Sequence, residues 1–252
     1  MIAKREATPL KSRKNRRRRI AKIFCEVIAM RMHRKCHLDE RLLACNKILT
    51  VADLSDKNMK RSAEVKEYLD FEKIFKNSNP VHLEIGCGKG KFVVETAKLN
   101  PDINFVAVEK ISNVIIDACE RTVEEGLENV YFLNCAAEVL PKYFRENSVD
   151  VIYLNFSNPL PKEGYKKQRL THTRFLKIYA DILKQGGRII QKTDDKDFYL
   201  FSLENYKEAG FEIKEVCEDL KNHPVKGDIE TEHEKRFKEM GKPIFRIVAE
   251  VK

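Results

Sequence analysis

The chain has 252 residues, of which 42% are hydrophobic, and a formal net charge of +9. This length suits one α/β domain with additions, and no apolar run approaches the ~20 residues that span a bilayer, so we expect no membrane segment. The seven cysteines form no C-x-x-C pair, and an odd number excludes a closed disulfide framework. Reduced thiols of this kind predict a cytoplasmic protein without a metal cluster.

The positive charge is concentrated at the N-terminus. Residues 1–35 hold 13 Lys or Arg against two acids, and the remaining chain holds 35 basic and 37 acidic side chains. The run at 11–19, KSRKNRRRR, fits a tail that binds phosphate backbones, a nuclear signal or an unstructured solvated tail. We predict a basic, disordered extension over 1–35, a region of short helices over 36–79, including one at 63–75, and the main domain over 80–252.

A glycine-dense turn follows the first strongly apolar run. Residues 81–92 read VHLEIGCGKGKF, and a helical pattern continues behind them. Strand, glycine turn and helix predict a nucleotide-binding device, with Gly86 and Gly88 letting a ligand approach the backbone. The carboxylate of Glu84 repels a pyrophosphate and attracts a cation, which favours S-adenosylmethionine (SAM) over NAD. A dinucleotide site and a purely structural turn remain open at this point.

A second apolar run, 103–108, ends in another acid, Glu109. A carboxylate at the end of the second strand can accept hydrogen bonds from both ribose hydroxyls of an adenosine. NAD sites share this acid, so Glu109 indicates an adenosine ribose and does not choose between the two cofactors. The alternative is a solvated residue at the start of a helix.

Strands and helices alternate from residue 81 onward, which predicts a parallel sheet covered on both faces. The last two apolar segments have no crossover helix between them and predict an antiparallel pair at one edge, as is typical of SAM-dependent methyltransferases. We expect strands at 81–85, 103–108, 130–135, 149–156, 187–193, 211–220 and 244–251, and helices near 89–100, 113–126, 171–184 and 196–209.

Three further segments map to the carboxyl ends of strands, where open sheets bind ligands. The backbone of 134–137 could pair with an adenine edge. The loop 153–171 has a stiff N-x-x-N-P-x-P core and then four cations, Lys162, Lys166, Lys167 and Arg169. These predict a phosphate-bearing acceptor or, alternatively, a solvated surface loop. The acids of 191–195 and 231–234 could accept from a nucleobase, and His233 is more often structural than catalytic. No cluster has metal-ligand spacing.

These segments resemble the bacterial tRNA (guanine-N7)-methyltransferase family from about residue 71 to 252. The similar stretches are EIGCGKGKF at 84–92, NPDINFVAVE at 100–109, YLNFSNPLPK at 153–162, RLTHTRFL at 169–176, KTDD at 192–195, TEHEKRF at 231–237 and GKPIFR at 241–246. The resemblance implies a Rossmann-like class I methyltransferase fold, with a mostly parallel seven-stranded sheet, an antiparallel edge strand and helices on both faces. It also implies methyl transfer from SAM to N7 of guanosine 46 in the tRNA variable loop.

Carried over by motif, the resemblance assigns roles to individual residues. The cofactor site would comprise Glu84, Gly86, Gly88, Glu109, Cys135, Ala136 and Asn158. The tRNA guanosine would be held by Lys162, Asp194, Thr231, Glu232, His233 and Glu234, with Asn158 and Asp194 at the catalytic position. The chain departs from the family pattern where Asn158 replaces the catalytic aspartate, Leu160 a tryptophan, Ala136 an aspartate and Gln168 an arginine.

These departures predict a slower enzyme, because Asn158 can orient a base through its amide but supplies no charge. Guanine N7 carries a lone pair at neutral pH, so catalysis needs alignment rather than a strong general base. We expect tRNA as partner, no metal, and a monomer or homodimer. Two alternatives remain, a divergent paralogue that binds tRNA with weak or no transfer and a SAM methyltransferase with another RNA acceptor. An NAD oxidoreductase is disfavoured by Glu84 and by the antiparallel ending.

Residues 1–29 have no counterpart that the resemblance provides, and the segment from Met30 is similar to the basic start of family members. We therefore expect residues 1–29 to lie outside the functional protein, as read-through from a misplaced start would produce. An RNA-binding tail is the alternative, and it would steepen the salt dependence of tRNA affinity.

Overall fold

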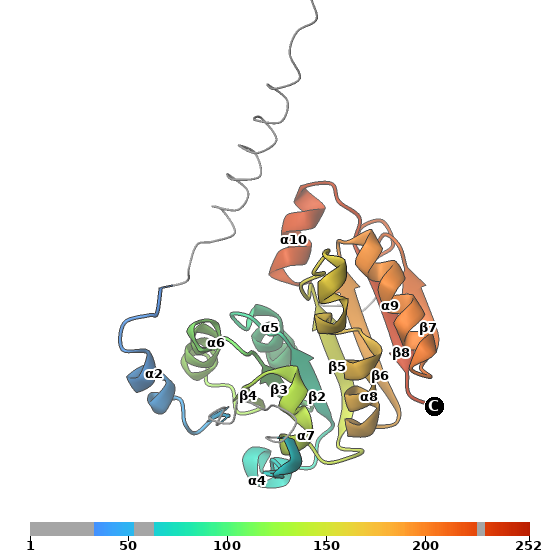
Figure 1. The fold of residues 1–252 in the computed structure, drawn as a ribbon. Coiled ribbons are helices and arrows are strands. Elements are labelled where there is room, and N and C mark those ends of the chain that lie inside the picture. The colour runs from blue at the N-terminus through green and yellow to red at the C-terminus, as the bar shows by residue number, and fades with distance from the viewer. Residues whose placement is uncertain (1–32, 53–62, 226–229) are drawn as a thin grey trace, which may run out of the picture. The chain divides into compact units, whose positions relative to one another are not determined.

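The computed structural model describes residues 33–52, 63–225 and 230–252, so the expectations for residues 1–29 lie outside the described part. Residues 37–252 form one compact unit (Figure 1). Its strands are β1 (Leu49–Val51), β2 (Val81–Ile85), β3 (Asn104–Val108), β4 (Val130–Asn134), β5 (Val149–Asn155), β6 (Leu183–Thr193), β7 (Glu212–Cys217) and β8 (Phe245–Glu250). Its helices are α2 (Leu38–Ala44), α4 (Phe71–Phe75), α5 (Lys91–Leu99), α6 (Ser112–Glu124), α7 (Leu140–Tyr143), α8 (Thr173–Ile182), α9 (Lys196–Glu208) and α10 (Glu232–Glu239), with short 3-10 turns at Ala137–Val139 and Glu163–Gln168.

The eight strands form one sheet in the order β1-β4-β3-β2-β5-β6-β8-β7. Strands β1 to β6 pair in parallel, and β8 runs antiparallel to both β6 and β7. The Rossmann-like architecture and the antiparallel pair at one edge are confirmed. The strand order reverses between β2 and β5, which makes this the topological switch point where such sheets bind ligands.

Two details of the sheet differ from the prediction. It has eight strands rather than seven, because the three residues Leu49–Val51 add β1 in parallel beside β4. A run of three is too short for its alternation to be read as a strand. The antiparallel strand β8 also lies one position in from the edge, which β7 occupies.

Alternate side chains of the strands point to two separate cores, as the pleat of a strand requires. In β3, for example, Val106 and Val108 join one core, and Phe105 and Ala107 join the other. Buried side chains of α4, α7, α8 and α9 complete the first core. Those of α2, α5 and α6 complete the second, so helices cover both faces of the sheet.

The helix predicted over 63–75 is wrong in its middle. The backbone N–H groups of Glu67 and Leu69 donate to the carbonyls of Lys142 and Tyr143, which draws this stretch out along the neighbouring segment. Helix α4 begins only at Phe71, where the Asp70 side chain accepts from the N–H of Lys73. A local helical pattern therefore yielded to long-range backbone pairing. Within the described residues, no helix is long and apolar enough to cross a membrane.

Candidate active site

The glycine turn after β2 lets a ligand approach the backbone closely. Gly86, Gly88 and Gly90 all have positive φ angles, which are +84°, +58° and +76°. A Cβ on Gly86 or Gly88 would meet no atom within 4 Å, so open space lies above both. A Cβ on Gly90 would clash with Ala118 of α6, so this glycine instead allows α5 and α6 to pack closely. The first two glycines therefore leave room for a ligand, and the third is structural.

Glu84, the fourth residue of β2, lies beneath this turn with a nearly buried carboxyl group. Its side chain is 3% exposed, and its Oε1 accepts a hydrogen bond of 3.1 Å from Nδ2 of Asn155. Among the described residues, no group donates a hydrogen bond to its buried Oε2. Burial raises the pKa of Glu84 to about 7, the Asn155 hydrogen bond opposes this, and the nearby charge of Glu109 adds to it. Burying a carboxylate oxygen without a donor costs free energy, and a ligand that is cationic or donates a hydrogen bond would offset that cost.

Cys87 lies between the two open glycines and lines the same space. Burial raises the pKa of its thiol well above the usual range, so the thiol stays protonated. A protonated, buried thiol of this kind is unreactive, so Cys87 does not have the properties of a nucleophile.

The ends of β3 and β4 place the other expected cofactor residues. The Glu109 side chain is half-buried just after β3, and its Oε1 accepts from the N–H of Ile111 at 2.9 Å. Cys135 and Ala136 are buried just after β4. Asn134, the last residue of β4, joins these strand ends through a 2.7 Å hydrogen bond from its Nδ2 to the Glu109 carbonyl. All of these residues therefore lie at the carboxyl edge of the sheet, on the β3–β4 side of Glu84.

The loop after β5 holds two non-glycine residues in the left-handed region, Phe156 with φ +50° and Leu160 with φ +45°. Each such residue costs about 1–3 kcal/mol of strain, so surrounding contacts must hold the loop. Asn158 is exposed, and its Oδ1 accepts from the N–H of Leu160 at 3.1 Å. In this structure the predicted catalytic Asn158 thus shapes the turn, and it does not line the pocket described below.

The cations after this loop have different environments. Lys162 is exposed, and Nζ of Lys166 lies 2.6 Å from Oε1 of Glu163. Arg169 is buried, with its guanidinium 4.4 Å from the ring centroid of Phe201, and its Nη2 donates to the Leu160 carbonyl. The sequence grouped Arg169 with the phosphate-binding cations, and its burial and internal contacts disfavour that role. Arg169 instead braces the strained loop.

Helix α10 is anchored to the sheet by a buried ion pair. Nζ of Lys192, in β6, lies 2.9 Å from Oε2 of Glu234, and both side chains are 1% exposed. Oε1 of Glu234 pairs with Lys238 at 2.7 Å, and Thr231 and Glu234 form a capping box. The carboxylate of the expected substrate residue Glu234 is thus engaged within the protein, and it positions the start of α10.

The remaining expected substrate residues lie near this helix. Oδ2 of Asp194 accepts from Nζ of Lys242 at 3.1 Å, which balances its charge. The His233 ring stacks on Phe156 with 5.8 Å between centroids and 23° between planes. Glu232 begins α10, and its side chain lies outside the described part.

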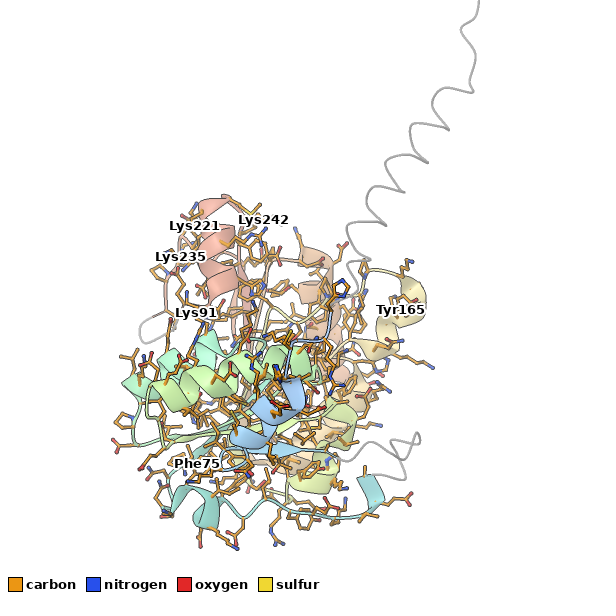
Figure 2. The ribbon with its side chains drawn as sticks, turned by 90° about the vertical axis from the view of Figure 1, so that its left-hand side faces the viewer. Phe75, Lys91, Tyr165, Lys221, Lys235 and Lys242 are labelled. Carbon is orange, nitrogen blue, oxygen red and sulfur yellow. The ribbon has the colours of Figure 1, made fainter. Side chains whose placement is uncertain are left out.

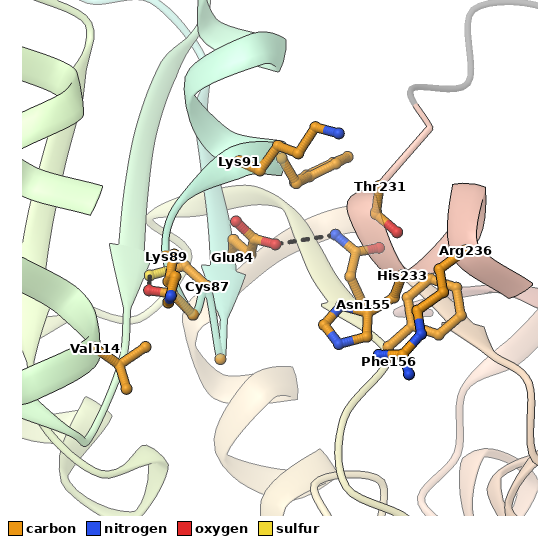
Figure 3. A pocket seen from close by; sticks show the side chains of 13 residues that line it. Glu84, Cys87, Lys89, Lys91, Val114, Asn155, Phe156, Thr231, His233 and Arg236 are labelled. Atoms are coloured by element: carbon orange, nitrogen blue, oxygen red, sulfur yellow. Dashed lines mark hydrogen bonds between the residues drawn. The ribbon is translucent and has the colours of Figure 1, made fainter. Parts of the chain in front are cut away.

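One pocket of about 400 Å³ collects part of this set (Figure 3). Of the residues expected from sequence, it brings together Glu84, Gly86, Gly88, Thr231 and His233. Those not among its lining residues are Glu109, Cys135, Ala136, Asn158, Lys162, Asp194 and Glu234. The other lining residues are Cys87, Lys89, Lys91, Phe92, Val114, Asn155, Phe156 and Arg236.

Two of the lining residues carried a usable signal. Asn155 ends β5, which pairs with β2 at the switch point. A polar residue at the carboxyl end of this strand is therefore expected near Glu84. Arg236 follows His233 by three positions on a helix, which puts the two on one face. In the sequence, Asn155 stands out only as the first residue of the N-x-x-N-P-x-P loop core.

The residues fit SAM. The open glycine turn leaves room for its methionine part, and Oε2 of Glu84, which receives no hydrogen bond within the described ranges, can accept one from a cationic amine. Glu109 has no protein donor to its Oε2 among the described residues, so this oxygen can accept from a ligand hydroxyl. The described residues contain no group of three or more His, Cys, Asp or Glu that could hold a metal ion.

Comparisons with known proteins agree with this geometry. A family described as "Putative methyltransferase" matches residues 78–247. A tRNA (guanine-N(7)-)-methyltransferase of Lachnoclostridium phytofermentans is 43% identical over 180 residues, which are 71% of this chain and 84% of the relative. A protein of the same name from Bacillus subtilis is 40% identical over 177 residues, covering 70% and 83%.

Solved structures show the same fold at lower identity. A chain titled "Structure of an antibiotic related Methyltransferase" has a TM-score of 0.57 at 22% identity, covering 73% of this chain and 97% of that one. The 16S rRNA methyltransferase KamB has a TM-score of 0.57 at 18% identity, covering 74% and 95%. These neighbours indicate the class I methyltransferase fold. On its motifs, its fold and its curated relatives, this chain belongs to the tRNA (guanine-N7)-methyltransferase family.

Proposed function

We propose that this protein transfers a methyl group from SAM to N7 of a guanine in tRNA, and that the acceptor is guanosine 46 of the variable loop. The observation that carries the proposal is the pocket at the β2–β5 switch point. Its floor is the buried Glu84, whose Oε2 receives no hydrogen bond from the described part of the chain, and its sides are the open glycine turn and the start of α10. SAM, once bound, supplies an electrophilic methyl carbon on its sulfonium.

The protein's own residues serve mainly to bind and orient. Glu84, Gly86 and Gly88 would hold the methionine end of the cofactor, and Glu109 with Cys135 and Ala136 its adenosine. Thr231 and His233 line the opposite side of the pocket, where the guanine would enter. Because N7 already carries an in-plane lone pair, no side chain has to remove a proton, and alignment provides most of the rate enhancement.

Methylation leaves a positive charge on the purine, and a nearby carboxylate would stabilise the developing charge. Glu84 is the one carboxylate among the described residues that line the pocket. Asp194 contributes less, since Lys242 already balances it. Asn158 lies outside the lining and carries no charge, which supports a slow rather than a fast methyltransferase.

Mass spectrometry of tRNA nucleosides tests the proposal directly. Unmodified tRNA incubated with the protein and SAM should gain 7-methylguanosine, and a transcript with adenosine at position 46 should gain none. Methylation that persists in that transcript would contradict the position. Methylation of another RNA in preference to tRNA would favour the alternative acceptor, and tRNA binding without transfer would favour a non-catalytic paralogue. A cytoplasmic location and a monomeric or dimeric state are part of the same proposal.

A further inference from the structure

The pocket separates charges of opposite sign. Its floor holds the carboxylate of Glu84, and its walls hold three cations, Lys89 and Lys91 from the α5 side and Arg236 from α10. Figure 3 shows Lys91 and Arg236 on different sides of the Glu84–Asn155 pair. An acidic floor suits a cationic cofactor, and basic walls suit an anionic partner. The same cavity is therefore equipped for two ligands of different charge.

Two of the three wall cations are available for a ligand. Nζ of Lys89 lies 3.8 Å from Oδ2 of Asp117, so its charge is partly balanced. Lys91 is half-buried and Arg236 is exposed, and within residues 33–52, 63–225 and 230–252 neither forms a side-chain hydrogen bond or ion pair. Two other lysines near α10 already form ion pairs, Lys238 with Glu234 and Lys242 with Asp194.

An aromatic surface accompanies Arg236 on its side of the pocket. Phe156, held at φ +50°, stacks on His233, and both line the cavity. Aromatic faces of this kind take up bases by stacking. A base inside a folded RNA reaches such a pocket only when it is turned out of its stack, and its two phosphates then remain at the rim.

We propose that Lys91 and Arg236 bind the backbone phosphates that flank the acceptor nucleotide, and so hold it with its base turned into the pocket. This inference rests on the proposed function and concerns how the protein binds the RNA backbone at the acceptor nucleotide. A guanidinium can bind a phosphate through two hydrogen bonds, whereas the ammonium of Lys91 acts as a point charge.

The basic loop after β5 does not meet the same conditions. Lys166 is paired with Glu163, and Arg169 is buried beneath the loop. Lys162 is exposed but does not line the pocket. Any phosphate that it binds would lie farther along the tRNA than the acceptor nucleotide.

The experiment compares Lys91→Gln, Arg236→Gln and the double variant with a matched control, Lys73→Gln. Lys73 is exposed on α4, and Phe75 at the end of that helix lies toward the opposite end of the molecule from Lys235 and Lys242 (Figure 2). The tRNA dissociation constant of each protein is measured over a series of salt concentrations. Calorimetry gives the SAM affinity of the same samples.

Removing one phosphate-binding side chain should lower the slope of log K against log salt by about 0.7, so the double variant should fall by about 1.4. SAM affinity should stay at the wild-type value in all of these variants. Lys73→Gln should keep the full slope, and the charge-conserving variants Lys91→Arg and Arg236→Lys should also keep it. An unchanged slope in the double variant, or an equal fall in the control, would overturn the inference. If the slopes shift as expected but the wild type forms no 7-methylguanosine, the phosphate-binding role stands and the proposed activity falls.

Discussion

Replacing Glu84 with Gln should stabilise the cofactor-free protein above neutral pH while weakening its affinity for SAM. Burial raises the pKa of Glu84 to about 7, from 4.5 for an ordinary glutamate. The folded state therefore binds this proton more tightly than the unfolded state does. The contribution of Glu84 to the free energy of unfolding is therefore fully present below about pH 4.5 and is lost as the pH rises to 7, above which the loss is constant at about 3 kcal/mol.

The glutamine variant carries no such loss, and its amide oxygen can still accept from Asn155 as Oε1 of Glu84 does. At pH 8 we expect its free energy of unfolding to exceed that of the wild type by up to about 3 kcal/mol, and at pH 4.5 the two should be close. Urea unfolding followed by circular dichroism at both pH values measures the difference. Equal stability at pH 8, or a variant less stable at every pH, would refute the assignment of a charged, unsatisfied carboxylate.

The same carboxyl group predicts a proton signal on cofactor binding. A cation bound beside Glu84 favours its ionised form, so SAM should release protons when it binds near pH 7. Titration calorimetry in buffers with different ionisation enthalpies measures this release. The wild type should show it, and Glu84→Gln should bind weakly and show none.

Three further changes test the loop after β5 and the start of α10. Burial acts to raise the pKa of Glu234, but the charges of its lysine partners outweigh burial and lower the pKa. Lys192→Met should therefore lower the free energy of unfolding by up to about 3 kcal/mol at pH 7, and by less as acid protonates Glu234. A double-mutant cycle with Glu234→Gln, measured by urea unfolding, should show coupling between the two residues. Arg169→Lys removes the guanidinium from the face of Phe201, so kcat should fall while the salt slope of tRNA affinity stays the same, and a lower slope would make Arg169 a phosphate ligand after all. Asn158→Asp keeps a side-chain acceptor for its turn and adds a charge, so single-turnover methylation should rise with little change in tRNA affinity; a level or lower rate would remove Asn158 from the catalytic position.

Periodicity predicted the fold well because most elements are long and strongly patterned. The range of β2 matched its prediction, and the positions of α5, α6, α8 and α9 were correct to within a few residues. The failures have a common cause in long-range pairing. Strand β1 exists because its three residues pair with β4, and residues 66–70 are not helical because Glu67 and Leu69 pair with the backbone at Lys142 and Tyr143.

The candidate site was harder to predict, because part of its wall (Thr231, His233 and Arg236) comes from a helix distant in sequence. Motif spacing pointed to Glu84 and the glycines, which are adjacent in sequence. The role of Arg236 depends on α10 docking against β6 through Lys192 and Glu234, which are 42 positions apart. Arg169 shows the converse, since a cation in a polar loop gives no sign in sequence that an aromatic ring and a carbonyl will bury it.

The two margins of the sheet bear on how copies of this protein can associate. At one margin, β1 offers only three residues to an incoming strand. At the other, β7 carries Glu212 and Lys214, with an ion pair between them, and Glu215, which pairs with Arg246. Short and charged margins discourage strand addition and aggregation. Any homodimer should therefore form through helices or loops, and the continuous sheet should end within each copy.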